Sequence, residues 1–191
     1  MLNHQNYKMA AGGAGVIAYK KGEGQQAFVL LSERSEKVGA GLGITGGGFV
    51  ECDEVNNQPP GYVLPLTHEA WREAVEENPG FEKIISRESF DERATYLTAF
   101  AVSTNDQHGV HLVCYFGLEL SDAEFLAVQA LPPSDERIGA LIPAKLSWTR
   151  ESLKKEALKE KINLEGMNKF YHQHELYAFL ALTKKLESIT K

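Results

Sequence analysis

The chain has 191 residues, a length that fits one domain with a modest extension and excludes two large domains. Apolar residues make up 43% and charged residues 24%, so the chain can bury a core and does not belong to the disordered class. The net charge of −6 argues against nonspecific nucleic-acid binding, because such binding requires a basic face. An acidic protein that acts on an anionic substrate is expected to need a metal ion.

The cysteine content and the hydropathy indicate a protein of the cytoplasm. Cys52 and Cys114 are too few for a disulfide scaffold, and both are expected to be reduced. No run approaches the ~18 apolar residues that a membrane helix needs, and the first residues lack the apolar segment of a signal peptide. We therefore expect a cytoplasmic location and no membrane partner.

The first half of the chain predicts a hairpin, a glycine-rich stretch and a helix. Residues 14–19 and 27–31 are β-prone runs on either side of a polar, turn-rich connection. Glycine-dense residues 39–48 follow, and then a Pro-rich loop over 56–61. A helix capped near Thr67 is predicted to end at Glu77, because the next residue precedes a proline and is disfavoured in helical conformation.

The second half predicts a further hairpin, a strand and more helix. Residues 94–102 and 110–118 have the aromatic and β-branched content of strands, with a turn between them. A short helix over 121–130, a strand over 138–142 and two helices, one within 149–161 and one in the last segment, complete the expected elements. The order predicts a mixed α/β layer structure. We expect a single domain over 1–191, with a core of about 10–147 and helices of about 148–191 packed on it.

Three carboxylates of the central helix carry the clearest chemical signal. Glu73, Glu76 and Glu77 stand at i, i+3 and i+4 and are predicted to share one helix face. Crowded carboxylates repel one another unless a cation lies among them, and oxygen ligands suit Mg²⁺, Mn²⁺ or Ca²⁺. Trp71, Ala74 and Val75 are predicted to face the sheet. The alternative interpretation is an ordinary solvated helix face.

The glycine stretch and the helix together resemble the signature of the Nudix hydrolases, G-x5-E-x7-R-E-U-x-E-E-x-G-U. Gly48 and Glu54 have five residues between them, as the signature has. The helix repeats the Arg-Glu-x-x-Glu-Glu spacing, and Gly-Gly-x-Val-Glu begins at Gly47. The residues that carry this resemblance are Gly47, Gly48, Val50, Glu51, Glu54, Arg72, Glu73, Glu76, Glu77 and Gly80.

The sequence departs from the signature at three places. Seventeen residues, 55–71, replace the seven that the signature has between its first Glu and its Arg, so ten are inserted. Ala74 occupies a position that usually carries a larger aliphatic residue, and two residues instead of one precede Gly80. The first insertion falls in a loop, where added length costs little closure entropy. It leaves the placement of Glu54 against Arg72 open.

The resemblance implies an αβα sandwich with a mixed central sheet, extended here by C-terminal helices. It also implies hydrolysis of a diphosphate bond in a nucleoside diphosphate linked to another group, with Mg²⁺ or Mn²⁺. Glu73, Glu76 and Glu77 would hold the cation, and Glu73 and Glu77 would also take part in catalysis. Arg72 would hold the carboxylates in place, through Glu54 or a nearby backbone group.

The resemblance further assigns roles to residues outside the carboxylate helix. Gly47 and Gly48, together with Glu54, would lie at the substrate site, because glycine lets the backbone approach the helix closely. In some members of the family a later loop supplies the general base, which makes Glu136 a candidate; a solvent-exposed turn is the alternative there. The expected partner is a small nucleotide, and a homodimer is common in the family.

Two further patterns have ordinary explanations. Residues 41–46 fit G-x-G-x-x-G, but a dinucleotide fingerprint requires a helix at its end, and here Phe49-Val50-Glu51 follows. Tyr96 lies 16 residues beyond Gly80, a distance that is similar to the pattern of dinucleoside polyphosphate hydrolases. A core aromatic on a strand is the simpler interpretation of Tyr96.

Two rival functions share the fold. The first is a Nudix-like module that binds a nucleotide without cleaving it, and it is suggested by the altered spacing. The second is an isomerase of isoprenyl diphosphates, which is disfavoured because neither cysteine lies in a recognisable Cys-His setting.

Overall fold

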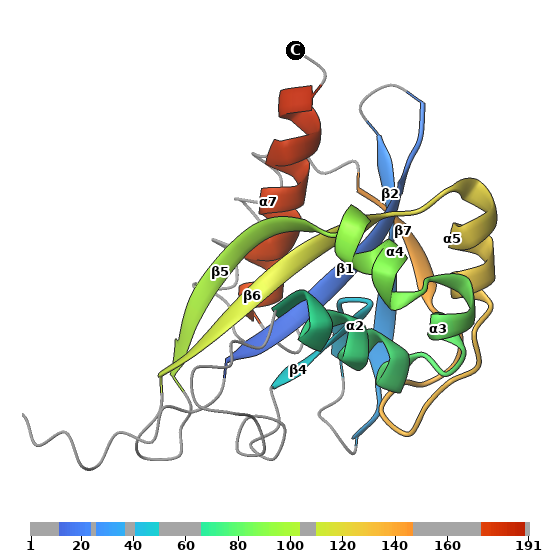
Figure 1. Cartoon of the computed structure of the whole chain (residues 1–191), viewed down its shortest axis with the longest axis horizontal. Coiled ribbons are helices and arrows are strands. Elements are labelled where there is room, and N and C mark those ends of the chain that lie inside the picture. Colours follow the sequence, from blue (N-terminus) through green and yellow to red (C-terminus); the bar gives the residue numbers. More distant parts are fainter. Residues whose placement is uncertain are drawn as a thin grey trace, which may run out of the picture.

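A mixed β-sheet forms the centre of the computed structural model, which describes residues 12–23, 26–36, 41–49, 66–103, 110–146 and 173–189 (Figure 1). The described strands are β1 (Gly13–Lys21), β2 (Ala27–Arg34), β3 (Gly41–Gly43), β4 (Gly46–Phe49), β5 (Thr95–Ser103), β6 (Val110–Glu119) and β7 (Ile142–Lys145). Their main order is β3-β2-β1-β6-β5, while β4 pairs with β1 and β7 pairs with β2. The β1–β6 pair is parallel and the other described pairs are antiparallel, so the sheet is mixed as predicted.

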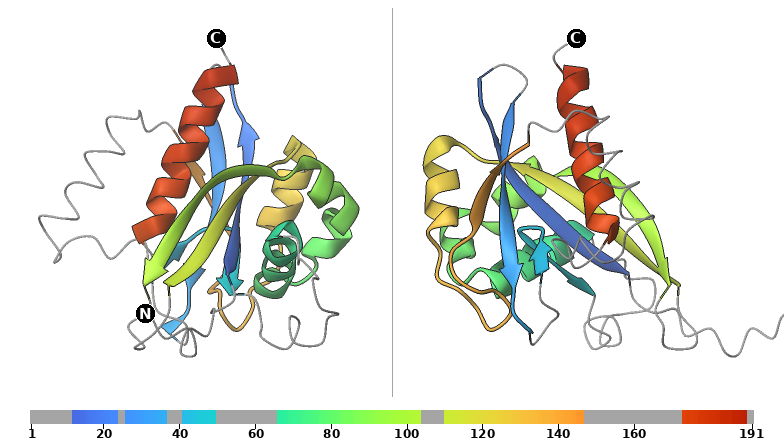
Figure 2. Two further views of the ribbon diagram at one scale, coloured as in Figure 1. Left: turned by 60° about the vertical axis from the view of Figure 1, so that its left-hand side comes forward. Right: turned by 180° about the vertical axis from the view of Figure 1, so that it is seen from behind.

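Helices cover both faces of this sheet. On one face lie α2 (Leu66–Glu77), α3 (Phe81–Ile84), α4 (Arg87–Arg93) and α5 (Asp122–Gln129), and on the other lies α7 (Gln173–Ile189) (Figure 2). Because both faces are covered, residues 13–19 of β1 are all buried instead of alternating between core and solvent. None of the helices in the described ranges is long and apolar enough to cross a membrane.

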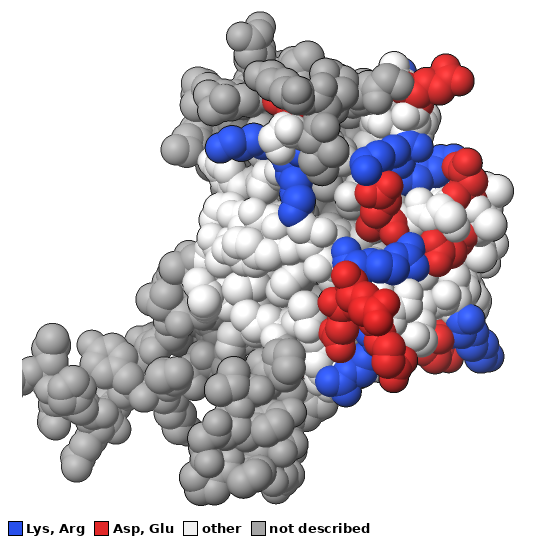
Figure 3. Space-filling view, turned by 45° about the horizontal axis from the view of Figure 1, so that its top comes forward, with Lys and Arg blue, Asp and Glu red and all other residues white. Residues whose placement is uncertain are grey.

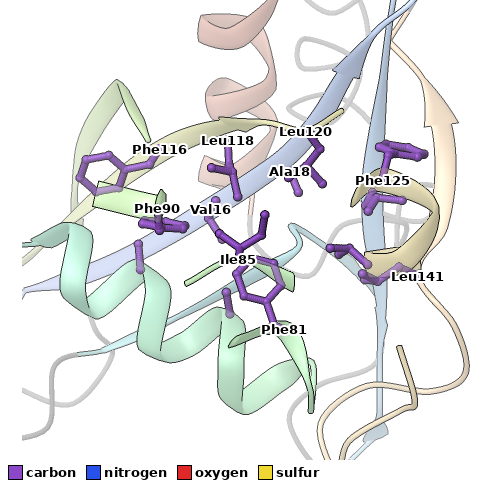
Figure 4. Close-up of a cluster of buried hydrophobic side chains, with 14 of the residues drawn as sticks. Val16, Ala18, Phe81, Ile85, Phe90, Phe116, Leu118, Leu120, Phe125 and Leu141 are labelled. Carbon is purple, nitrogen blue, oxygen red and sulfur yellow. The ribbon is translucent and has the colours of Figure 1, made fainter. Parts of the chain in front are cut away.

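Each face of the sheet has its own apolar core. The core under α2–α5 joins Val16 and Ala18 of β1 to Phe81, Ile85 and Phe90 of the helical layer (Figure 4). The core under α7 takes the alternate β1 residues and packs them against the helix; it contains Ile17, Tyr19, Ala178, Phe179 and Leu182. Successive side chains of a strand point to opposite faces of the sheet, so alternate residues of β1 belong to the two cores.

Local chemistry explains where several helices begin and end. Ser121 caps α5 and forms a capping box with Glu124. Helix α2 ends at Glu77 as predicted, and Gly80 then takes a φ of 97°, which favours glycine and starts α3. Ser86 caps α4. The chain pattern predicted neither α3 nor α4.

Two of the predicted features are wrong in detail. The strand expected over 138–142 is displaced to β7, because Gly139 takes a φ of 68° and interrupts the chain before it. Tyr96 is 56% exposed and is not a core residue, because it lies on β5 at the edge of the sheet, next to a register shift between Tyr96 and Thr98. The helix expected within 149–161 lies outside the described residues.

The surface around the helical layer is covered by paired charges. Basic and acidic side chains alternate along this side of the molecule, next to a broad uncharged area (Figure 3). Ion pairs among the described residues of this surface include Lys20–Asp122, Lys21–Glu119, Arg87–Asp91 and Arg93–Glu124. A pair between exposed side chains, such as Arg87–Asp91, contributes at most about 1 kcal/mol.

Candidate active site

A row of buried carboxylates runs along α2. Glu69, Glu73 and Glu77 follow one another at a spacing of four residues and are 0%, 7% and 4% exposed. Glu76, by contrast, points away from this row and its side chain is 57% exposed. Glu76 thus differs from Glu73 and Glu77 in exposure, but Arg72 contacts both Glu73 and Glu76, so these two carboxylates occupy neighbouring parts of the helix surface. The common metal site of Glu73, Glu76 and Glu77 stays a prediction.

Arg72 binds three of the four acidic side chains of the helix. Its guanidinium pairs with Glu69 at 2.5 Å, with Glu76 at 2.7 Å, and also with Glu73. These hydrogen bonds raise the pKa of Arg72. Arg72 therefore holds the carboxylates directly, whereas the sequence suggested contact through Glu54, a residue that lies outside the described ranges.

The glycines of β4 allow the helix to lie against the strand. A Cβ on Gly46 would come within 2.7 Å of the Ala74 Cα, which belongs to the helix backbone. A Cβ on Gly48 would overlap the Glu73 carboxylate. Ala74 is itself fully buried in the core under the helical layer.

Gly47 contributes a hydrogen bond instead of empty space. Its N–H donates to Oε1 of Glu77 at 3.1 Å. Burial raises the pKa of Glu77 to about 7, and the charge of Arg34 and this N–H oppose that increase. Burial also raises the pKa of Glu73, while the charge of Arg72 lowers it. Both carboxylates are thus held where an added cation would favour their ionised form.

Glu136 lies on an exposed loop near the end of α2. Its negative charge raises the pKa of Glu77, which places the two carboxylates within electrostatic range. The next residue, Arg137, is 1% exposed and anchors this loop. Its guanidinium donates to the carbonyls of Glu77 at 3.4 Å and Leu131 at 3.1 Å, and also to that of Gly139. The loop that the sequence proposed is therefore fixed beside the carboxylate row.

The donor chemistry of this row suits a hard cation. Carboxylate oxygens are the ligands that Mg²⁺ and Mn²⁺ prefer, and two of them, on Glu73 and Glu77, are buried along β4. Within the ranges that the structure describes, no three His, Cys, Asp or Glu side chains converge as a complete ligand set.

Several polar residues of this region were not predicted. Glu69 lies four residues before Glu73, as Glu73 lies four residues before Glu77. This repeat could have predicted that Glu69 belongs to the same row. On α7, Glu175 lies on the same helix face as the apolar residues Ala178, Phe179 and Leu182. An acidic residue on an apolar face is an irregularity that the sequence shows. Asn78 and Arg34 gave no signal in the sequence, since only the folded chain brings them to the β3–β4 turn.

The G-x-G-x-x-G match lacks the helix that a dinucleotide fingerprint requires, as predicted. Residues 41–46 form β3, the turn after it and the start of β4, and no helix begins at the last glycine. The geometry required to place a pyrophosphate on a helix N-terminus is therefore not present at this position.

Comparison with known proteins identifies the fold. No family model and no curated protein matches the chain. Among solved structures, it is similar to a MutT/nudix family protein from Enterococcus faecalis, with 15% identity and a TM-score of 0.55, covering 95% of this chain and 64% of the other. It is also similar to the Nudix domain of Shewanella oneidensis NrtR complexed with ADP ribose, with 14% identity and a TM-score of 0.55, covering 97% and 94%.

The chain thus spans less than two thirds of the Enterococcus protein and nearly all of the Shewanella domain. At these identities the likeness concerns the fold. The mixed sheet between α2–α5 and α7, which the sequence predicted as an αβα sandwich with a C-terminal helical extension, is the Nudix fold.

Proposed function

We propose that the protein is a metal-dependent hydrolase that cleaves the diphosphate bond of a nucleoside diphosphate linked to another group. The observation that carries this proposal is the pair of buried carboxylates, Glu73 and Glu77, packed on a strand of three glycines. Burial of two neighbouring carboxylates is unfavourable, and strongly perturbed carboxyls of this kind gather at sites that bind a cation or perform chemistry. The Nudix fold adds support to this interpretation.

Glu73, Glu76 and Glu77 are the residues that would hold Mg²⁺ or Mn²⁺. The bound cation would neutralise the pyrophosphate oxygens and polarise the attacked phosphorus. Glu76 would have to leave its contact with Arg72 to take part. Arg72 would then keep Glu69 and Glu73 in position, and Gly47 and Gly48, with Glu54, would border the substrate.

The proton of the attacking water requires a nearby acceptor. Glu77 is the first candidate, because its carboxylate belongs to the buried row that would border the cation and the attacking water. Glu136 is the second candidate, since it is exposed on the loop that Arg137 fixes beside Glu77. Glu136→Gln tests the second candidate by itself, because Glu136 is not among the proposed metal ligands.

The test is hydrolysis of a panel that contains ADP-ribose, nucleoside diphosphate sugars and dinucleoside polyphosphates, with Mg²⁺ and with Mn²⁺. We expect turnover by the wild type, no turnover in chelator, and loss of turnover in Glu77→Gln. The matched control is Glu82→Gln, which removes the same charge from an exposed position on α3 and should retain activity.

A second candidate function is nucleotide binding without cleavage. It is favoured by the ten-residue insertion in the signature and by the Shewanella Nudix domain, whose structure holds ADP ribose. If the entire panel resists hydrolysis while nucleotides bind in a metal-dependent way, this binding function replaces the hydrolase. Glu77→Gln would then leave binding nearly intact.

A further inference from the structure

Glu175 is a buried carboxylate on the helix that covers the sheet face opposite α2 (Figure 2). It is 3% exposed, although it belongs to the first turn of α7. Its Oε2 accepts a hydrogen bond from the backbone N–H of Ile44 at 3.2 Å. This contact joins the C-terminal helix to the turn between β3 and β4, 131 residues earlier in the chain.

The same turn is bound from the other side by Glu77. Ile44 donates to Glu175, and Gly47, three residues later, donates to Glu77. Burial raises the pKa of both carboxylates, and the charge of Arg34 on β2 opposes this increase in each, so one guanidinium lies within electrostatic range of the two acids. Two buried carboxylates from helices on opposite faces of the sheet therefore hold one tetrapeptide, Ile44–Gly47.

Other hydrogen bonds also hold the turn, but they do not involve the Ile44 N–H, whose acceptor is Glu175. Thr45 N–H donates to the Val16 carbonyl at 3.1 Å, and the Ser32 hydroxyl donates to the Ile44 carbonyl at 2.7 Å. These bonds use other atoms of the turn. Ile44 is 2% exposed, so loss of the Glu175 carboxylate would leave its N–H buried without that acceptor.

We propose that Glu175 is a positioning residue of the active site, which acts through the Ile44–Gly47 turn to fix the Gly47 N–H against Glu77. The carboxyl oxygen of Glu175 supplies the acceptor for Ile44, so Gln at this position keeps an acceptor oxygen and Ala removes it. The C-terminal helix is then a part of the catalytic machinery and not only a cover for the sheet. The catalytic consequence rests on the proposed hydrolase function, whereas the structural link does not.

The experiment measures local amide exchange and kinetics in Glu175→Gln and Glu175→Ala. NMR-detected exchange of the Ile44 and Gly47 amides should become about tenfold faster in Glu175→Ala and less so in Glu175→Gln, by more than the loss of global stability measured by urea unfolding accounts for. On the substrate found in the panel, kcat should fall about tenfold in Glu175→Ala while KM changes less than about twofold. The isosteric Glu175→Gln variant carries the test if the alanine variant does not fold.

The control is Glu187→Gln, which removes a carboxylate from the same helix three turns later. It should leave both amides and kcat at wild-type values. The proposal is overturned if Gly47 exchanges at the wild-type rate in the Glu175 variants, or if all amides accelerate together as global unfolding requires. It is also overturned if kcat is unchanged. Failure of the hydrolase proposal is distinguishable, because the exchange measurement needs no substrate.

Discussion

The carboxylate of Glu73 lies directly against Gly48, in the space that a Cβ at position 48 would occupy. Two residues earlier in the same strand, Gly46 lies against the backbone of Ala74. The two glycines point toward the same helix, but one meets a movable carboxylate and the other meets fixed backbone. This difference allows the catalytic and the structural roles of the glycine strand to be separated.

Gly48→Ala is expected to lower kcat/KM strongly with little loss of stability. The added methyl displaces the Glu73 carboxylate, and a displacement of this kind costs on the order of 100-fold in rate. Because the carboxylate can rotate away, the free energy of unfolding in urea should change by less than about 1 kcal/mol. The measurement is kcat/KM beside a urea unfolding curve.

Gly46→Ala is the matched comparison. Its Cβ would lie 2.7 Å from the Ala74 Cα, so strand and helix must separate, at about 2 kcal/mol of stability. If Gly48→Ala were instead the less stable of the two variants, with activity retained, the carboxylate contact would have no catalytic role.

Arg72→Ala is expected to destabilise the metal-free protein by about 3 kcal/mol, since it leaves Glu69 buried without its partner. Arg72→Lys should recover less than half of this loss, because an ammonium cannot bind three carboxylates with the fork of a guanidinium. Denaturant unfolding measures both. Arg87→Ala, which removes an exposed ion pair with Asp91, should change stability by less than about 0.5 kcal/mol. Equal effects at positions 72 and 87 would contradict the central role of Arg72.

The local elements could be predicted because their signals are short in sequence. The two hairpins, the end of α2 before Pro79 and the cap of α5 all depend on neighbouring residues. Strand β4 could not be predicted, since three consecutive glycines have low strand propensity. They form a strand because α2 needs to approach that backbone closely, which is a tertiary requirement.

The candidate site was predictable in part for the same reason. Spacing within one helix grouped Glu73, Glu76 and Glu77. It did not predict that Glu73 and Glu77 are buried while Glu76 is exposed, because the orientation of α2 on the sheet is not contained in the helix pattern. The parallel pairing of Gly13 with Val113 and the contact of Glu175 with Ile44 join segments about a hundred residues apart. No local pattern encodes such contacts.

The metal-free protein is expected to lose stability as the pH rises from about 4.5 to about 8. Burial raises the pKa of Glu77 to about 7 and that of Glu175 to about 8, both above the ordinary value of 4.5. A carboxyl whose pKa is higher in the folded state binds its proton more tightly there, so its contribution is complete below 4.5 and disappears as the pH passes the folded pKa.

Thermal unfolding in chelator, measured at intervals from about pH 4.5 to about pH 8.5, tests this slope. The low pKa of Glu124, about 2, affects stability only below this window. Glu77→Gln should flatten the curve between about pH 5 and about pH 7, because one titrating group is removed. A stability that increased across this range in chelator would contradict the buried, protonated state of Glu77.

Asn78→Ala is expected to reduce the free energy of unfolding by about 2 kcal/mol. The Asn78 side chain is fully buried, and its Nδ2 donates to the carbonyls of Thr45 at 2.8 Å and Ala74 at 2.9 Å. Loss of this donor leaves the buried Thr45 carbonyl unsatisfied, whereas the Ala74 carbonyl still accepts from the Asn78 backbone at 3.1 Å. Urea unfolding at about pH 8 measures the change.

Asn78→Asp separates the hydrogen bond from the volume of the side chain. At about pH 8 the introduced carboxylate would face two carbonyl oxygens, so this variant should be less stable than Asn78→Ala. At about pH 4 protonation of the introduced carboxyl restores one O–H donor, and the stability order of the two variants should reverse. An order that does not depend on pH would show that Asn78 fills space without anchoring the Thr45 carbonyl. The hydrogen bond of Gly47 to Glu77 and the packing of Gly46 against Ala74 would then be the described contacts that fix α2 to this turn.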